Sequence, residues 1–240
     1  YKAFPGAEKI QVVRGLPSEI VDRLVERGGS FGHLEQEKGG NYDSVITIID
    51  WEMFKELAFD MMEEAGVQVL LHTMVVDAIM EGNVIKGVII EGKSGREAIL
   101  AKTVIDTTGD ADVAFRAGCN CVKRHDTTKV GMPFGMGGVD MPRLVAFLEE
   151  HDMITQIVHA DKGSEKDDIV RLGFDLKKIP VFKEFMEKEG MWGPLGVSRY
   201  EGDYSYINSA SLPAIDATDT VTLSMAEMKL RKQAMTLARM

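Results

Sequence analysis

The chain has 240 residues, of which 45% are hydrophobic and 28% are charged. This composition is sufficient for a buried core, and the length suits one large domain or two smaller ones. A formal net charge of −10 argues against nucleic acid and anionic membrane as partners. No apolar run approaches the roughly 18 residues that a membrane-spanning helix needs, so we expect a soluble, cytoplasmic protein.

The first elements are predicted from apolar spacing and capping residues. A helix is expected over residues 17–27, followed by a loop over 29–42. The β-branched run 45–49 predicts a strand. Asp50 is placed to cap a second helix, which the apolar spacing extends over 51–65.

Short apolar runs separated by glycine-containing turns predict an antiparallel β-meander. Its expected strands are residues 67–71, 75–80, 84–91 and 97–101. Such short turns force neighbouring strands to run antiparallel. The next run, 103–106, is expected to return beside the first strand, so that a parallel sheet is interrupted by the meander.

The segment 103–118 predicts a strand, a tight turn and a helix. Gly109 lets a backbone approach closely, and the threonine hydroxyls and the free N–H groups that open the helix can bind phosphate or hydroxyl oxygens. Asp110 or Asp112 can cap the same donors. The segment therefore predicts a ligand-binding corner, and the alternative is a tight turn with a capped helix start.

From Cys119 onward the composition changes, which predicts a second, substrate-side domain over 121–240. The glycine cluster 135–138 is interpreted as a flexible loop, with a phosphate nest as the alternative. Cys119 and Cys121 lack companions at zinc-site spacing, so we expect reduced thiols and no metal site. Three short amphipathic helices are expected here: around 140–150, 165–174 and 180–189.

Several segments occur in an order that is informative as a whole. The main succession is Glu64-Ala-Gly-Val67, the meander, and Thr107-Thr-Gly-Asp-Ala-Asp112. It resembles the FAD-dependent oxidoreductases of the glutathione-reductase-type superfamily, and within them the fumarate-reductase-like group. Later segments are similar to that group's middle section: Gly15-Leu-Pro-Ser18, Tyr206-Ile-Asn208, Asp216-Ala-Thr-Asp219 and Ala226-Glu-Met-Lys-Leu-Arg231.

The resemblance implies a fold class and a cofactor. The fold is expected to be α/β (mixed α+β), with an incomplete FAD-binding sheet and its antiparallel meander over residues 1–120, plus the substrate-side domain over 121–240. The implied cofactor is FAD, and the implied partner is a small-molecule substrate.

The resemblance also implies cofactor-binding residues. It places Thr107, Thr108 and Gly109 near FAD, on the side of its ADP half, and the backbone of Val75 near the adenine. Asp110 is expected to order the turn, since its charge would repel phosphate. The alternative for the aspartates is that they only cap the start of the helix. The alternative for Val75 is that it is an ordinary buried strand residue.

Two parts of such flavoproteins are missing from the sequence. They open with a strand, a Gly-x-Gly-x-x-Gly turn and a helix, and they close with a Gly-Asp segment near the flavin, neither of which occurs here. The chain begins at Tyr1 and ends in a helical pattern without a C-cap. We therefore expect an internal fragment whose apolar sheet edges promote a homodimer.

Catalytic residues are the least defined by the sequence. Hydride exchange between a flavin and a carbon acid or alkene needs cations to hold a carboxylate and a group that exchanges a proton. The candidates are Arg124 and His125, and Arg199 in the aromatic segment 192–206; the alternative is that each is merely solvated. The function expected is the middle section of a flavin-dependent oxidoreductase, and the alternative is a non-catalytic ligand-binding or oligomerisation module.

Overall fold

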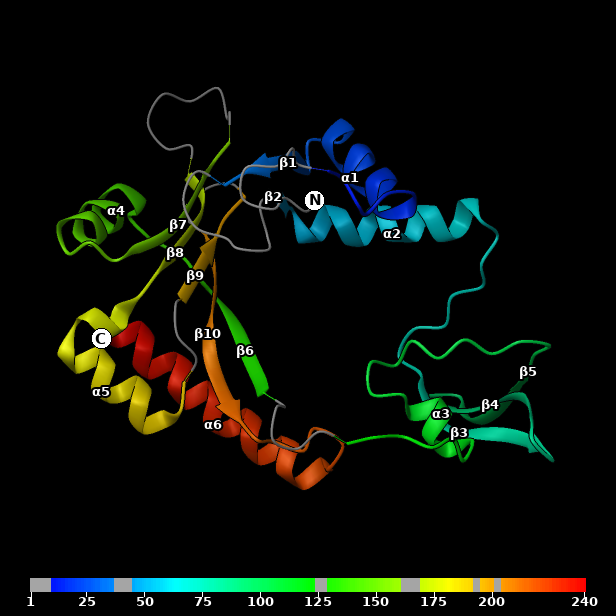
Figure 1. Ribbon diagram of the computed structural model, residues 1–240. Helices are drawn as coiled ribbons and strands as arrows, with labels where there is room; N and C mark the ends of the chain where they lie inside the picture. The colour runs from blue at the N-terminus through cyan, green and yellow to red at the C-terminus, as the bar shows by residue number, and fades with distance from the viewer. Residues whose placement is uncertain (1–9, 37–44, 124–128, 161–168, 192–194, 201–203) are drawn as a thin grey trace. The chain divides into compact units, whose positions relative to one another are not determined.

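The computed structural model describes residues 10–36, 45–123, 129–160, 169–191, 195–200 and 204–240 (Figure 1). The chain has a mixed α/β fold with antiparallel sheets, which confirms the predicted fold class. The elements are α1 (Leu16–Glu26), β1 (Ser30–Glu35), β2 (Val45–Ile49), α2 (Trp51–Glu64), β3 (Met74–Glu81), β4 (Val84–Gly92), β5 (Gly95–Leu100), α3 (Asp112–Arg116), β6 (Lys129–Met136), α4 (Met141–Glu150), β7 (Ile154–His159), β8 (Ile169–Phe174), the 3₁₀ helix η1 (Leu176–Lys178), α5 (Pro180–Glu189), β9 (Leu195–Ser198), β10 (Ser205–Pro213) and α6 (Thr220–Arg239).

The chain divides into two compact units. The larger unit joins residues 1–61 with 126–240, and the smaller unit comprises residues 62–125. The N-terminal elements therefore belong to the same compact unit as the C-terminal half. The functional division at residue 120 stays a prediction, because compactness alone does not assign a role to either part.

The smaller unit contains the predicted meander. Strands β3, β4 and β5 form a three-stranded antiparallel sheet in that order. The pairing of Glu81 with Val84 leaves a two-residue turn, in which Gly82 has a φ of +59°. Glycine adopts such a backbone angle without steric cost. The predicted glycine-containing turn between these two strands is therefore confirmed. Helix α3 contacts β3.

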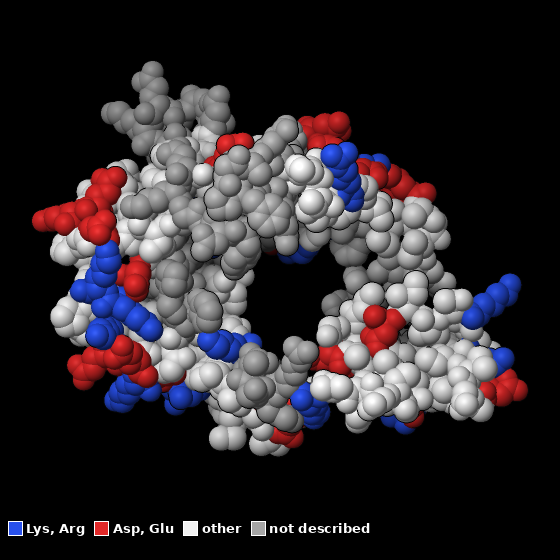
Figure 2. Space-filling view, viewed as in Figure 1, with Lys and Arg blue, Asp and Glu red and all other residues white. Residues whose placement is uncertain are grey.

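Two runs predicted as strands are not strands. Residues 67–71 and 103–106 pair with no other strand in the part of the chain that the structure describes. The predicted parallel sheet is therefore wrong, because a β-strand needs a hydrogen-bonding neighbour as well as an apolar pattern. Leu71 is 57% exposed and Ile105 is 82% exposed. Figure 2 shows that acidic and basic side chains are scattered over the surface of this unit, with uncharged side chains between them.

The larger unit is built on a five-stranded antiparallel sheet in the order β6, β10, β9, β8, β7. Of the helix predicted around 165–174, residues 165–168 lie outside the described residues, and the rest is instead strand β8, in which Val170, Leu172 and Phe174 are buried at a spacing of two. The predicted glycine loop is likewise wrong in part, because Gly135 lies within β6. Both segments are strands because they pair with neighbouring strands, which a short local pattern does not specify.

The strand register aligns one apolar row across all five strands. It passes from β6 to β7 through the paired residues Phe134, Ile207, Val197, Leu172 and Ile157. These side chains share one face of the sheet because cross-strand partners point to the same side. Helices α4, α5 and α6 cover this face, where the main core cluster contains their Leu148, Met186 and Leu237 side chains.

The adjacent row points to the opposite face and differs in chemistry. Its paired residues are Gly135, Tyr206, Ser198, Arg171 and Val158. Part of this face is covered by the β1–β2 hairpin, since Val158 packs in a cluster with Ile48 of β2. The alternation of strand residues thus separates an apolar face from a polar and aromatic one.

The N-terminal elements agree with most predictions and correct one. Helix α1, strand β2 and helix α2 are confirmed, whereas the predicted loop 29–42 contains strand β1. The β1–β2 pairing is supported by Ser30, whose hydroxyl donates a 2.8 Å hydrogen bond to the carbonyl of Ile48. Asp50 caps α2 as predicted, since its Oδ1 accepts from the N–H groups of Glu52 at 2.8 Å and Met53 at 3.0 Å.

The longest helix, α6, has 20 residues and begins at Asp219, whose Oδ1 accepts from the N–H of Thr222 at 2.7 Å. Its buried residues Ala226, Leu230 and Ala234 pack against β10 and β6. None of the helices in the described ranges combines the length and the apolar character that crossing a membrane requires.

The central apolar row should carry much of the stability of the larger unit. Leu172 is fully buried, so Leu172→Ala should lower the free energy of unfolding by about 2–5 kcal/mol through lost burial and a residual cavity. Leu223→Ala, at a 40% exposed position on α6, is the matched control and should change it by about 0.5 kcal/mol or less. Urea denaturation followed by tryptophan fluorescence measures both. Equal losses would contradict the assignment of Leu172 to the core.

Candidate functional site

The corner in the smaller unit is organised by one carboxylate. Asp106 Oδ1 accepts from the N–H of Thr108 at 3.0 Å and from its hydroxyl at 2.7 Å. Its other oxygen, Oδ2, accepts from the N–H of Ala114, in the first turn of α3, at 2.9 Å. Thr108 Oγ1 in turn accepts from the N–H of Asp112 at 2.8 Å. A carboxylate from before the turn therefore caps the helix after it.

This geometry corrects two predictions about the corner. Asp106 orders the turn, rather than Asp110 or Asp112, because it precedes the turn and can reach across it. The N–H groups of Asp112 and Ala114 were expected to be free for a ligand, but the side chains of Thr108 and Asp106 accept from them. The sequence pattern predicted the presence of donors at this helix start and not which acceptor would occupy them.

The hydrogen bonds also hold the Asp106 carboxyl in its charged form. Those from Thr108, first from its hydroxyl and then from its N–H, lower the pKa of Asp106 below its ordinary value of 3.8. The N–H of Ala114 adds to the same effect, and desolvation acts in the opposite direction without reversing it. Asp106 therefore remains ionised, and able to accept these bonds, throughout the physiological pH range.

The predicted cofactor-binding residues all lie in the smaller unit. Thr107, Thr108, Gly109 and Asp110 form the turn before α3, and Val75 is half-buried in β3, the strand that α3 contacts. The register between β3 and β4 shifts next to Val75, as in the bulges that often accompany functional sites. Gly109 has a φ of +92°, and a Cβ added there would meet no atom within 4 Å, so its face is open.

The stability of the corner should depend on acid pH. Because the pKa of Asp106 is lowered on folding, the stabilisation is present above the unfolded pKa and is lost as pH falls through the folded pKa. Thr108→Val removes the largest cause and should raise the pKa of Asp106 toward 3.8. NMR titration of the Asp106 carboxyl carbon measures this change. Asp106→Asn identifies the signal by deleting it, and an unchanged pKa in Thr108→Val would contradict the assigned cause.

The second candidate site is a pocket of about 710 Å³ in the larger unit. We call it the aromatic pocket. Its walls come from β2, the start of α2, the end of β9, and the residues before and within β10. The lining residues are Thr47, Ile48, Ile49, Asp50, Trp51, Glu52, Ser198, Arg199, Tyr200, Tyr204 and Tyr206.

Aromatic rings form one side of this pocket. Trp51 lies against Tyr204 in an edge-to-face arrangement, with ring centroids 5.3 Å apart, and its centroid is 6.4 Å from that of Tyr206. All three side chains remain 40–45% exposed. Gly135 makes this arrangement possible, because a Cβ there would overlap the Tyr204 ring. The glycine of the predicted loop thus provides space for an aromatic side chain of the pocket.

Two arginine residues lie on the same face of the sheet. Arg199 lines the pocket and is only 8% exposed, and its backbone N–H donates a 3.0 Å hydrogen bond to the carbonyl of Val170. Next to it, Arg171 Nη1 donates to Ser198 Oγ at 2.7 Å, and Arg171 Nε donates to Gln156 Oε1 at 3.0 Å. Gly196 leaves room for Arg171, since a Cβ there would lie 2.5 Å from its Nη2.

The pocket combines a largely buried guanidinium with phenol and hydroxyl groups, a donor set that suits an organic anion. Both carboxylates of the lining are already engaged, since Asp50 caps α2 and Glu52 pairs with Lys55 at 2.6 Å. The exposed ring faces can contact a planar or apolar part of the same ligand. Chemically, the arrangement can bind and orient a carboxylate-bearing small molecule.

The predicted catalytic residues have different outcomes. Arg199 is in the aromatic pocket together with Tyr206 of the predicted aromatic segment, whereas Arg124 and His125 lie outside the described residues. Sequence reasoning missed Trp51, which was predicted only as the start of a helix. The available signal was a tryptophan directly after a capping aspartate. Its pocket neighbours Tyr204 and Tyr206 lie about 150 residues away in the chain, so the sequence did not identify them.

Comparison with known proteins supplies the family. The family described as FAD dependent oxidoreductase matches residues 3–240, which is nearly the whole chain. The same comparisons found no matching curated protein and no matching solved structure. The family's cofactor is FAD. With its meander, its Thr-Thr-Gly-Asp corner and this match, the chain belongs to the FAD-dependent oxidoreductase family.

Proposed function

We propose that the chain contributes the Thr107–Asp110 corner to an FAD site and binds a small carboxylate-bearing substrate in the aromatic pocket. The activity proposed is that of an oxidoreductase of the fumarate-reductase-like kind. The observation that carries the substrate half is Arg199, a largely buried guanidinium in a pocket lined by aromatic rings. Family membership supports the flavin half.

The corner fits a particular part of the cofactor. Gly109 presents an open backbone face, and its positive φ turns the chain sharply before α3. Three carboxylates, Asp106, Asp110 and Asp112, lie in this short segment. The N–H groups of Asp112 and Ala114 at the start of α3 already donate to side chains of the corner. Such a corner suits the hydroxyl and amide groups of FAD better than its doubly charged pyrophosphate.

When bound, FAD supplies the two-electron chemistry, accepting or donating a hydride. The chain's own residues bind and orient. Thr107 and the backbone around Gly109 offer donors to the cofactor, and Arg199 holds the substrate carboxylate. Arg171 positions Ser198, whose hydroxyl lies on the wall of the substrate pocket. The Trp51 and Tyr204 rings shield the bound acid from water.

The substrate half is tested by carboxylate binding. Arg199→Met in the purified protein should weaken succinate binding, measured by isothermal titration calorimetry, by about tenfold or more, as expected for a lost charged hydrogen bond of about 1.5–3 kcal/mol. Arg231→Met is the control, since Arg231 pairs with Glu227 on exposed α6 and lies outside the pocket. Equal affinity of Arg199→Met and the unaltered protein would overturn this half.

The flavin half is tested by measuring the absorption of the same purified protein. The purified protein should show a flavin absorption band at about 450 nm, or acquire it with added FAD. A colourless protein that does not take up FAD would favour a non-catalytic binding module. Succinate binding is measured by calorimetry and FAD binding by absorbance. The substrate half and the flavin half of the proposal can therefore be refuted independently.

Self-association is a further proposal for the smaller unit. Leu71, Met74, Leu100, Ile105 and Val122 are each more than half exposed, an apolar surface that favours contact with a second copy of the chain. Sedimentation equilibrium should therefore show a homodimer that Leu100→Lys with Ile105→Lys converts to monomer. A monomer at high protein concentration without these substitutions would count against the proposal.

A further inference from the structure

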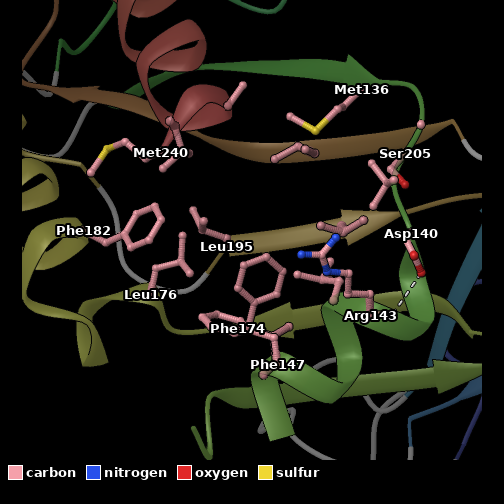
Figure 3. Close-up of a pocket in the computed structure, with 18 of the residues that line it drawn as sticks. Met136, Asp140, Arg143, Phe147, Phe174, Leu176, Phe182, Leu195, Ser205 and Met240 are labelled. Atoms are coloured by element: carbon pink, nitrogen blue, oxygen red, sulfur yellow. Dashed lines mark hydrogen bonds between the residues drawn. The ribbon is translucent and has the colours of Figure 1, made fainter. Parts of the chain in front are cut away.

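A second cavity in the larger unit has no role in the function proposed above. Its volume is about 520 Å³, within the usual range for small-molecule sites. Its apolar walls come from the sheet and from α4, α5 and α6, and include Met136, Phe147, Phe174, Phe182 and Leu195. We call it the helix-side cavity. Figure 3 shows these side chains surrounding a common space.

The helix-side cavity and the aromatic pocket open on opposite faces of the sheet. Ile207 and Val197, which line the cavity, belong to the apolar row, whereas Tyr206 and Ser198 of the aromatic pocket belong to the adjacent row. The two lining sets share no residue. A ligand in the cavity is therefore separated from the aromatic pocket by the thickness of the sheet.

The apolar wall contains one buried hydroxyl group that a bound ligand could satisfy. Ser205 lines the cavity and is fully buried, and its hydroxyl has no hydrogen-bond partner among the described residues. A buried hydroxyl without a partner is costly, and native proteins satisfy the great majority of such groups. In Figure 3 Ser205 lies at the same end of the cavity as Asp140, with Phe182, Leu176 and Met240 toward the other end.

The charged groups at the rim define the head group of that ligand. Arg143 lines the cavity from an exposed position on α4, and no carboxylate forms an ion pair with it within the described residues. Figure 3 shows its guanidinium reaching in among the lining side chains. Asp140 is the other charged lining residue, and its Oδ1 caps α4 by accepting from the N–H of Arg143 at 3.1 Å. Arg143 can attract one carboxylate of a ligand, whereas the negative charge of Asp140 beside it would repel a second one, so a monoanion suits this site better than a dianion.

We propose that the helix-side cavity binds an amphipathic monocarboxylate, with the carboxylate on Arg143 and Ser205 and the hydrocarbon chain among the phenylalanine and leucine side chains. Arg143 forms the charged hydrogen bonds, and Ser205 donates its hydroxyl to a carboxylate oxygen. The apolar chain gains the burial that the opposite end of the cavity offers. This site is additional to the substrate pocket and does not depend on it.

The test uses the purified protein with decanoate, and with decanol as the uncharged probe of equal chain length. Arg143→Gln should weaken decanoate binding about tenfold or more while leaving decanol unchanged. Lys183→Gln, an equal charge change at an exposed α5 position outside the cavity, is the control and should leave both unchanged. Decanoate binding should persist in Arg199→Met, which distinguishes this site from the aromatic pocket.

Two further readouts locate the ligand. Decanoate should shift the ¹³C-methyl NMR signals of the lining residues Met136 and Met240 and leave that of exposed Met228 unmoved. Ser205→Ala should weaken decanoate binding several-fold and raise the thermal midpoint of the free protein, because it deletes a hydroxyl that only the ligand satisfies. Absence of decanoate binding, an unmoved Met136 signal, or equal loss of decanoate and decanol in Arg143→Gln would overturn the proposal.

Discussion

Alternate residues of a β-strand point to opposite faces of its sheet, and the larger unit depends on how β9 and β10 use this alternation. Val197 and Ile207 join an apolar row that three helices cover, while Ser198 and Tyr206 join the row on the other face. A register shift of one residue would bury the polar set and expose the core. The pairing of these two strands therefore decides both where the core forms and where the polar pocket opens.

Two glycines have a structural role on that second face of the sheet, although glycine is usually associated with loops. Gly135 leaves space for the Tyr204 ring, and Gly196 leaves space for the Arg171 guanidinium. In each case a large side chain from a neighbouring position lies across the strand where a Cβ would be. The glycines thus build a polar and aromatic surface within a regular sheet, and the pocket around Arg199 is a consequence of that surface.

The smaller unit depends on a local contact instead. Asp106 links the extended segment before the turn to the first turn of α3 through hydrogen bonds to Thr108 and Ala114. A second Asp-x-Thr segment repeats part of this geometry before α6, where Asp216 Oδ1 accepts from the N–H of Thr218 at 3.0 Å and from its hydroxyl at 2.6 Å. Both segments precede a helix, which shows that the motif orders the chain locally and is not by itself evidence for a bound ligand.

The sequence by itself determined the features that depend on near neighbours: helix α2 with its cap at Asp50, the tight turns of the meander, and the order of segments that resembles a flavoprotein. Only the tertiary structure decided the rest. The local pattern predicts a helix where β8 forms and a strand over residues 67–71, and both predictions are wrong because a strand exists only with its partner. The aromatic pocket joins Trp51 to Tyr204 and Arg199, residues far apart in the chain. The packing of β2 against the five-stranded sheet, which no local pattern specifies, brings these residues together.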